Sequence, residues 1–209
     1  MSERQTQIVK KRYDRYSRIY DLLQNPIEKN LFAKWRKELL RNLNGKILEV
    51  GVGTGKNFPY YRKDAKVVGI DLSPKMLEKA KIKQAELGNK NITLLEMDAE
   101  NLKFKDNSFD CIVCTFVLCS VPDPIKVLKE MKRVCKKGGK IVMIEHMLSK
   151  YKIIALYEHI HNPITKRLFG FNVNRKTIDN IQKAGLKIDK ATNLAIFDVF
   201  KRIEIINDK

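Results

Sequence analysis

Five short apolar runs, rich in β-branched residues, constrain the fold of this 209-residue chain most strongly. They occupy residues 46–52, 66–72, 91–98, 109–116 and 140–147. None alternates strictly between apolar and polar residues, which is typical of strands buried on both faces of a parallel sheet. Helical stretches lie between them: residues 73–88 begin with Ser-Pro, and residues 123–139 begin with Asp-Pro and end in a glycine pair. The alternation predicts an α/β fold with a Rossmann-like, doubly wound sheet.

The two ends of the chain complete the expected organisation. Residues 186–206 favour two more strands in an antiparallel hairpin, which makes a mostly parallel, seven-stranded sheet. Residues 1–44 are expected to form amphipathic helices that act as a lid or a membrane contact. Residues 45–209 form the α/β domain, in which residues 148–176 are an insertion expected to meet the substrate. A chain of this length fits one such domain, and we expect a monomer.

Composition narrows the partners. The chain has 42 Lys and Arg against 24 Asp and Glu, a formal charge of +18 that favours polyanions such as nucleic acid or acidic lipid. A lysine-rich genome or a heat-tolerant host is the other interpretation. The longest apolar run is far shorter than the roughly 20 residues that span a bilayer, and the polar N-terminus has no signal-peptide core. We therefore expect a cytoplasmic protein.

The cysteines do not predict a metal site. Cys111 and Cys114 lie three residues apart on an expected strand, so their side chains should point to opposite faces of the sheet. Cys119 and Cys135 complete the set. We interpret all four as reduced thiols of the core, and we expect no metal.

The segment LEVGVGTGKNF, residues 48–58, indicates a bound ligand. A strand ends with Glu49 and runs into Gly51, Gly53 and Gly55, where the missing side chains let the backbone approach a bound molecule. The loop lacks the full G-x-G-x-x-G spacing of a dinucleotide fingerprint. A nucleoside without a pyrophosphate therefore fits better.

Acidic residues end the next two strands. Asp71 comes about 20 residues after the glycines, where a carboxylate is expected to bind ribose hydroxyls at the switch point of such a fold. Asp98, Ala99 and Glu100 follow the third strand and are placed to reach an adenine amine. Together, the strand ends predict a nucleoside site.

This series of strand ends resembles the S-adenosylmethionine site of class I methyltransferases, over residues 46 to about 147. The resemblance implies that S-adenosylmethionine is the cofactor and S-adenosylhomocysteine its product.

The resemblance also implies a role for each residue. The glycines border the methionine end of the cofactor, Asp71 holds the ribose, and Leu72 or Met76 packs on adenine. Asp98 and Ala99 read the adenine edge. The implied cofactor-binding set is Glu49, Gly51, Gly53, Thr54, Gly55, Asp71, Leu72, Met76, Asp98, Ala99 and Thr115.

Three acceptor classes lack their motifs in this sequence. Methylases of exocyclic base amines carry D/N-P-P-Y/F/W after the fourth strand, where this chain reads TFVLCSVPD. Cys119 has no preceding proline, which methylases of pyrimidine C5 need. The carboxylate and amide cluster of metal-dependent catechol methylases is not found. Nucleic acid is therefore a disfavoured partner, and the positive charge is expected to serve another anion.

The wider sequence resembles a narrower group of methyltransferases, whose acceptors lie in or beside membranes. The Y-D-x(5)-Y-D pattern of residues 13–21 is similar to the bacterial phosphatidylethanolamine N-methyltransferases, although Arg18 stands where they commonly have proline. VLCSVPDP followed by GGKIVMIEH is similar to both these and the microsomal thiol methyltransferase-like proteins. The third related group methylates ubiquinone and menaquinone precursors.

The resemblance favours stepwise methylation of the phosphatidylethanolamine amine toward phosphatidylcholine. Methylation of a quinone-precursor carbon is the main alternative, and S-methylation of a small thiol is the third. A cofactor-sensing or nucleic-acid-binding module with the same fold is the alternative without catalysis.

Two segments within residues 1–44 have an apolar and a basic face when drawn as helices. The first apolar stripe consists of Val9, Tyr13, Tyr16, Tyr20 and Leu23, and the second of Phe32, Trp35, Leu39 and Leu43. Lysines and arginines flank both, Arg36 among them, which suits a helix lying on an anionic bilayer. Packing on the domain core is the other interpretation. We expect the tyrosine stripe to cover the transferring methyl while its basic back meets the inner face of the membrane, as in a peripheral protein.

Catalysis needs an aligned acceptor and, for an ammonium, a base. Glu145 and His146 alternate at the end of the fifth run, so we expect one of them to face the cleft. Tyr13 and Tyr20 are expected to surround a methylated cation through their rings. The expected catalytic residues are Tyr13, Tyr20, Glu145 and His146. The expected substrate-binding residues are Tyr16, His159, His161 and Arg175, with the arginine assigned to a phosphate.

Overall fold

The structure, a computed structural model, describes residues 2–27 and 31–209, and describes side chains for residues 4–15, 17 and 31–209. Seven strands form one sheet in the order β3-β2-β1-β4-β5-β7-β6. The strands are β1 (Lys46–Val50), β2 (Lys66–Asp71), β3 (Ile92–Glu96), β4 (Phe109–Thr115), β5 (Cys135–His146), β6 (Lys190–Ala195) and β7 (Phe200–Ile206). The helices are α1 (Ser2–Ile27), α2 (Ala33–Leu40), α3 (Pro74–Glu86), α4 (Pro124–Val134), α5 (Lys152–Leu168) and α6 (Thr177–Lys183), with a 3-10 turn η2 (Phe58–Tyr60).

The sheet confirms the predicted Rossmann-like topology. β1 to β5 pair in parallel, with Leu48 opposite both Val68 and Ile112. β7 runs antiparallel to β5 and β6, as the predicted C-terminal hairpin requires. The strand order reverses between β1 and β4, so a crevice is expected at the carboxyl ends of these two strands.

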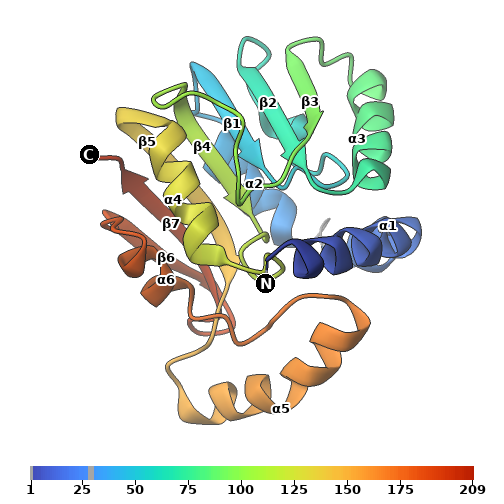
Figure 1. The fold of residues 1–209 in the computed structure, drawn as a ribbon, viewed down its shortest axis with the longest axis vertical. Coiled ribbons are helices and arrows are strands. Elements are labelled where there is room, and N and C mark those ends of the chain that lie inside the picture. The colour runs from blue at the N-terminus through green and yellow to red at the C-terminus, as the bar shows by residue number, and fades with distance from the viewer. Residues whose placement is uncertain (1, 28–30) are drawn as a thin grey trace.

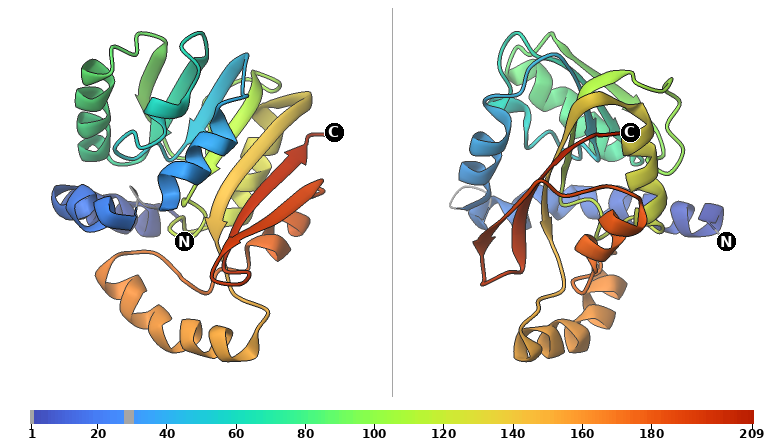
Figure 2. Two further views of the ribbon diagram at one scale, coloured as in Figure 1. Left: turned by 180° about the vertical axis from the view of Figure 1, so that it is seen from behind. Right: turned by 90° about the vertical axis from the view of Figure 1, so that its left-hand side faces the viewer.

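Two cores cover the two faces of the sheet (Figures 1 and 2). α4 and α6 pack on one face through Leu128, Met131 and Ile181. α2 and α3 pack on the other face through Leu40 and Leu77. Because both faces are covered, the strands carry the continuous apolar runs seen in the sequence.

The four cysteines are buried and free. Cys111 belongs to the core of α2 and α3, and Cys114 belongs to the core of α4 and α6. The prediction that these two side chains point to opposite faces of the sheet is confirmed.

The helix predicted over residues 123–139 is wrong at its C-terminal end. α4 begins where the Asp123 side chain caps it by accepting two backbone amide protons, and it ends at Val134. Cys135 has extended backbone angles and pairs with Phe109 at the start of β5. The fifth predicted strand therefore begins earlier than expected, because pairing with β4 overrides the helical preference of the lysines that follow.

The two N-terminal helices have different surroundings. α1 crosses the carboxyl edge of the parallel strands and contacts α3 (Figure 1). α2 lies on the sheet, and its predicted apolar stripe is used inside the protein: Trp35 and Leu39 are each 6% exposed. The rings of Trp35 and Phe32 lie 5.6 and 5.7 Å from that of Phe200 on β7. The apolar face of α2 is therefore not available to a bilayer.

The region of residues 148–176 contains α5, which stands away from the sheet on the side of the strand ends (Figures 1 and 2). Glu158 is the buried residue of this helix, and its carboxylate accepts the amide proton of Ser149 at 2.9 Å. In the described part of the chain, no helix has both the length and the apolar character needed to cross a membrane.

We predict that Trp35→Ala lowers the free energy of unfolding by about 3–5 kcal/mol, since removing a large buried aromatic side chain leaves a cavity. Lys34→Ala, an exposed neighbour, is the matched control and should change stability by less than about 0.5 kcal/mol. Urea unfolding followed by circular dichroism measures both. Equal stability of the two variants would mean that α2 does not pack on the sheet in solution.

Candidate active site

The loop after β1 is shaped by two glycines with positive φ. At Gly51 (φ 67°), a Cβ atom would lie 2.4 Å from Cγ2 of Val117, so no side chain fits between this loop and the one after β4. At Gly53 (φ 56°), a Cβ atom would meet nothing within 4 Å. The backbone at Gly53 thus borders open space, which leaves its surface accessible to a ligand.

Asp71 organises the carboxyl end of β2. One carboxylate oxygen accepts the amide proton of Gly53 at 2.8 Å, and the other accepts that of Ser73 at 2.9 Å. Burial raises the pKa of Asp71 to about 6, although both backbone bonds act to lower it. The hydroxyl of Ser73 caps α3 by accepting the amide proton of Met76, and it donates to the carboxylate of Asp14 at 2.5 Å. The last bond ties α1 to the start of α3.

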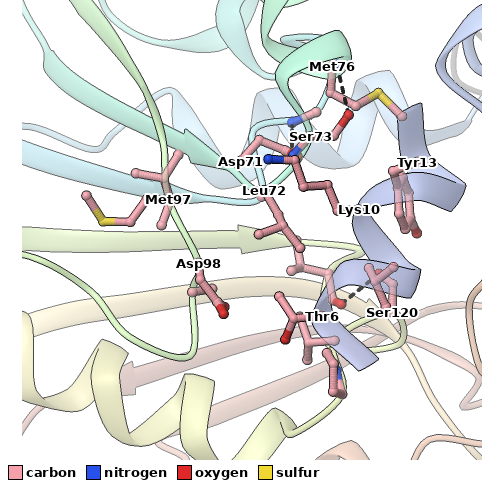
Figure 3. A pocket seen from close by; sticks show the side chains of 18 of the residues that line it. Thr6, Lys10, Tyr13, Asp71, Leu72, Ser73, Met76, Met97, Asp98 and Ser120 are labelled. Carbon is pink, nitrogen blue, oxygen red and sulfur yellow. Dashed lines mark hydrogen bonds between the residues drawn. The ribbon is translucent and has the colours of Figure 1, made fainter. Parts of the chain in front are cut away.

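A cavity, named here the strand-end cavity, lies between these strand ends and α1. Figure 3 shows Thr6, Lys10 and Tyr13 of α1 on one side, with Met97 and Asp98 on the opposite side. The cavity is lined by Thr6, Val9, Lys10, Tyr13, Gly51, Gly53, Ile70, Asp71, Leu72, Ser73, Met76, Met97, Asp98, Ala99, Thr115, Phe116, Val117, Ser120, Val121 and Pro122.

The first N-terminal helix covers this cavity. Val9 and Tyr13, two members of the predicted tyrosine stripe, lie in its lining. The side chains of Tyr16 and Tyr20, expected to bind substrate and to take part in catalysis, lie outside the described residues, as does that of Leu23. The described side chains of the stripe, Val9 and Tyr13, therefore cover the strand-end cavity, as predicted for a lid.

A buried polar network supports the glycine loop from below. Arg36 of α2 donates from Nη1 to Oδ1 of Asn57 at 2.8 Å and to Oγ1 of Thr115 at 2.9 Å. Asn57 Nδ2 donates to Glu49 at 2.8 Å, and the hydroxyl of Tyr61 donates to the other oxygen of Glu49 at 2.8 Å. Burial raises the pKa of Glu49 to about 7. The network joins α2, the end of β1, the glycine loop and the end of β4.

Most of the predicted cofactor residues meet in one place. The strand-end cavity is lined by Gly51, Gly53, Asp71, Leu72, Met76, Asp98, Ala99 and Thr115. Glu49, Thr54 and Gly55 are not in its lining, and Glu49 serves the polar network behind the loop.

The sequence reasoning missed several residues of this cavity. Ser73 lines it, although its Ser-Pro context signalled only the start of a helix. Thr6 and Lys10 line it from α1. Thr6 and Lys10 lie near Val9 and Tyr13 on one helix face, so helical spacing could have found them.

Glu145 and His146 point in different directions, as their alternation predicts. Glu145 is fully buried and accepts the amide protons of Val117 and Leu118 at 2.9 and 3.2 Å, so it holds the loop after β4. Burial raises its pKa to about 7. Burial lowers the pKa of His146 to about 4, and its ring lines a second cavity. Of the pair, His146 is the one placed to meet an acceptor.

The second cavity, named here the aromatic cavity, adjoins the first, because Tyr13 and Phe116 line both. It is lined by Tyr13, Phe32, Phe116, Cys119, His146, Ile154, Tyr157, Glu158, His161, Thr165, Phe171, Val173, Ile196, Val199 and Phe200. Phe116 has a positive φ of 59°, and its ring lies 4.7 Å from that of Phe32. This uncommon backbone conformation places an aromatic ring at the junction of the two cavities.

The two histidines predicted to bind substrate separate in the structure. His161 lines the aromatic cavity, with its ring 3.8 Å from that of Tyr157. His159 is exposed and is not in the lining of either cavity, and its Nδ1 lies 3.0 Å from the amide nitrogen of Asn174. Only His161 of this pair is placed to contact an acceptor.

Arg175, predicted to bind a phosphate, has partners inside the protein. Its guanidinium donates to the carbonyl oxygens of Cys119 and Val121 at 3.3 and 2.8 Å. It is absent from the lining of both cavities. The guanidinium therefore positions the loop after β4, next to the strand-end cavity.

The fold and the strand-end cavity together define a class of protein. Residues 48–143 match the family described as Methyltransferase domain. The chain belongs to the class I S-adenosylmethionine-dependent methyltransferases, as its strand ends predicted.

Curated relatives and a solved structure agree with this class. The chain is similar to a phosphatidylethanolamine N-methyltransferase of Cereibacter sphaeroides, with 46% identity over 49% of this chain and 51% of the relative, about half its length. It is similar to a demethylmenaquinone methyltransferase of Staphylococcus aureus, with 37% identity over 76% of this chain and 70% of the relative. A solved methyltransferase of Thermotoga maritima has the same fold, with a TM-score of 0.68 and 20% identity over 92% of this chain and 98% of that chain.

The strand-end cavity fits S-adenosylmethionine. The space over Gly53 leaves room beside the loop, and Asp71 offers a half-buried carboxylate for ribose hydroxyls. Leu72 and Met76 supply apolar contacts for adenine, and Asp98 stands at the far wall. When bound, the cofactor supplies a methyl group on a positively charged sulfur.

We predict that Asp71→Asn lowers S-adenosylhomocysteine affinity at about pH 8 by at least about tenfold, because a charged acceptor makes stronger hydrogen bonds than an amide. The wild-type affinity should also fall as the pH drops through about 6, where the carboxylate gains its proton. The variant should lack this dependence. Titration calorimetry over about pH 5 to pH 8 measures both effects.

Asp64→Asn is the matched control, since Asp64 is an exposed carboxylate paired with Arg62 and lies outside both cavities. It should bind the product like wild type at each pH. An unchanged affinity in Asp71→Asn would show that the ribose is held elsewhere.

Proposed function

We propose that the chain transfers methyl groups from S-adenosylmethionine to the amine of phosphatidylethanolamine, in steps toward phosphatidylcholine. The lining of the aromatic cavity carries this proposal. Its described lining holds six tyrosine and phenylalanine rings and one carboxylate, Glu158, with no lysine or arginine, in a chain of formal charge +18. Ring faces and a carboxylate attract an ammonium, and the rings continue to do so as it gains methyl groups.

The junction of the two cavities sets the geometry for transfer. Displacement at a sulfonium methyl requires an acceptor aligned with the carbon–sulfur bond and shielded from water. Tyr13 and Phe116 border both cavities, so an acceptor in the aromatic cavity reaches the methyl between these two rings. The two rings also exclude water from the point of transfer.

His146 is suited to take the proton that an ammonium must lose first. Its Nε2 lies 3.3 Å from the carbonyl oxygen of Asn172, which can only accept a hydrogen bond. This contact assigns the ring proton to Nε2 and leaves the lone pair on Nδ1. With a pKa of about 4, the ring is neutral at physiological pH and its lone pair is free, but it is a weaker base than an ordinary histidine and holds the proton only in passing. Burial in an apolar cavity also makes an ammonium release its proton more readily.

A quinone precursor is the second candidate, favoured by the aromatic lining and the neutral imidazole. A phenolic ring can stack on the aromatic lining while its hydroxyl gives a proton to His146. The likeness to the Staphylococcus aureus demethylmenaquinone methyltransferase, over 70% of that relative, supports this candidate. A small thiol is the third candidate, because a thiolate needs less activation at neutral pH.

We predict that labelled S-adenosylmethionine yields mono-, di- and trimethylated ethanolamine lipid, identified by mass, when the enzyme meets vesicles containing phosphatidylethanolamine. Parallel reactions contain a demethylated quinone or an alkyl thiol. Label found only in the quinone or the thiol would overturn the acceptor. Label in none of them would favour a cofactor-sensing role.

We predict that His146→Asn lowers kcat with the accepted substrate by about 100-fold or more, the usual contribution of a general base. Its affinity for S-adenosylhomocysteine should stay within about twofold of wild type, since His146 does not line the strand-end cavity. Steady-state kinetics and calorimetry measure the two quantities. A variant with wild-type kcat would remove His146 from the reaction.

A further inference from the structure

The outer face of α5 is apolar and uncovered. Its large apolar side chains recur at three- and four-residue steps and are between 54% and 86% exposed. They are Ile153, Leu156, Ile160, Ile164 and Leu168. These steps return to one side of a helix, so the five side chains form a continuous stripe. α5 lies on the outside of the molecule in every view (Figures 1 and 2).

The turn between β6 and β7 extends this stripe. Ile196 and Phe197 are both exposed, although both are large and apolar. Both have positive φ, 49° and 58°, a backbone conformation that glycine and asparagine adopt more readily. The ring of Phe197 lies 5.3 Å from that of Tyr151, next to the start of α5. The chain thus keeps two bulky apolar side chains at a strained turn that faces solvent.

Basic side chains lie at both ends of the stripe. Lys150, Lys152, Lys166 and Arg167 are all exposed. The acidic residue within α5, Glu158, is buried and faces the opposite way, into the aromatic cavity. The exposed surface of α5 therefore carries only positive charge among its ionisable groups.

The inner face of the same helix forms a wall of the acceptor site. Ile154, Glu158, His161 and Thr165 line the aromatic cavity from α5, and Ile196 lines it from the turn. Tyr157 belongs to both the inner and the outer face of α5, because its side chain lines the aromatic cavity and is also 62% exposed. A molecule held against the outer face of α5 is thus one helix diameter from the cavity, about 10 Å.

We infer that the outer face of α5, together with the turn at Ile196 and Phe197, docks on an anionic lipid bilayer. An apolar stripe with a basic rim suits a helix that lies in the interface between headgroups and acyl chains. A second copy of this chain suits the surface less, since a symmetric pairing through α5 would bring the basic rims of both copies together.

This surface replaces the apolar face of α2 as the membrane contact, because Trp35 and Leu39 of α2 are packed in the core. The inference rests on the proposed function, in which docking on a bilayer brings a lipid acceptor to the aromatic cavity. Vesicle binding itself does not depend on which acceptor is methylated, so the two are tested separately.

The test is flotation of the full chain with vesicles of phosphatidylcholine containing phosphatidylglycerol. Ile160→Glu combined with Ile164→Glu should lower the partition coefficient at least tenfold. Ile82→Glu is the matched control, since Ile82 is 60% exposed on α3 and lies outside both cavities. It should bind vesicles like wild type. High salt should weaken wild-type binding, because the basic rim is screened.

Three results separate the alternatives. Wild-type flotation that survives the α5 substitutions would overturn the inference. Sedimentation showing a dimer that the same substitutions dissociate, without vesicle binding, would assign the surface to a second copy. Retained S-adenosylhomocysteine affinity in the α5 variant, together with lost flotation, would show that the fold is intact and support the inference whatever the acceptor.

Discussion

The buried guanidinium of Arg36 is the interaction on which the site depends. It lies under the glycine loop and bonds to Asn57 and Thr115, while Asn57 bonds in turn to Glu49. Each partner comes from a different element, so the network fixes the ends of β1 and β4 against α2. Because an unpaired polar group in such a place is costly, the loop has one well-defined position. The open space over Gly53 and the placement of Asp71 follow from that position.

A second set of buried contacts fixes the loop after β4, which lies between the two cavities. Glu145 and Arg175 both bond to the backbone after β4, Glu145 to its amide groups and Arg175 to its carbonyl groups. This loop carries Phe116 and Ser120 into the strand-end cavity, and Phe116 also borders the aromatic cavity. The loop thus stands between the strand-end cavity and the aromatic cavity, and Phe116 lines both. His146, next to Glu145 on β5, lines the aromatic cavity.

The sequence predicted the parts of the site that local pattern controls. Asp71 and Asp98 end apolar runs, and strand ends in a parallel sheet meet at one edge, so their placement followed from the fold alone. Arg36 could not be assigned in this way. It resembles Lys34 and Lys37 in its surroundings, and only partners 21 and 79 residues away make it a buried residue. Arg175 was assigned to a phosphate for the same reason, because its carbonyl partners lie more than 50 residues earlier in the chain.

The most direct measurement is a crystal structure of the chain with S-adenosylhomocysteine bound. We expect the ribose hydroxyls within hydrogen-bond distance of the Asp71 carboxylate and the adenine against Leu72 and Met76. The sulfur should face the junction of Tyr13 and Phe116, so that a transferred methyl would point into the aromatic cavity. A product bound elsewhere, or with its sulfur turned away from that junction, would contradict the assignment of the two cavities.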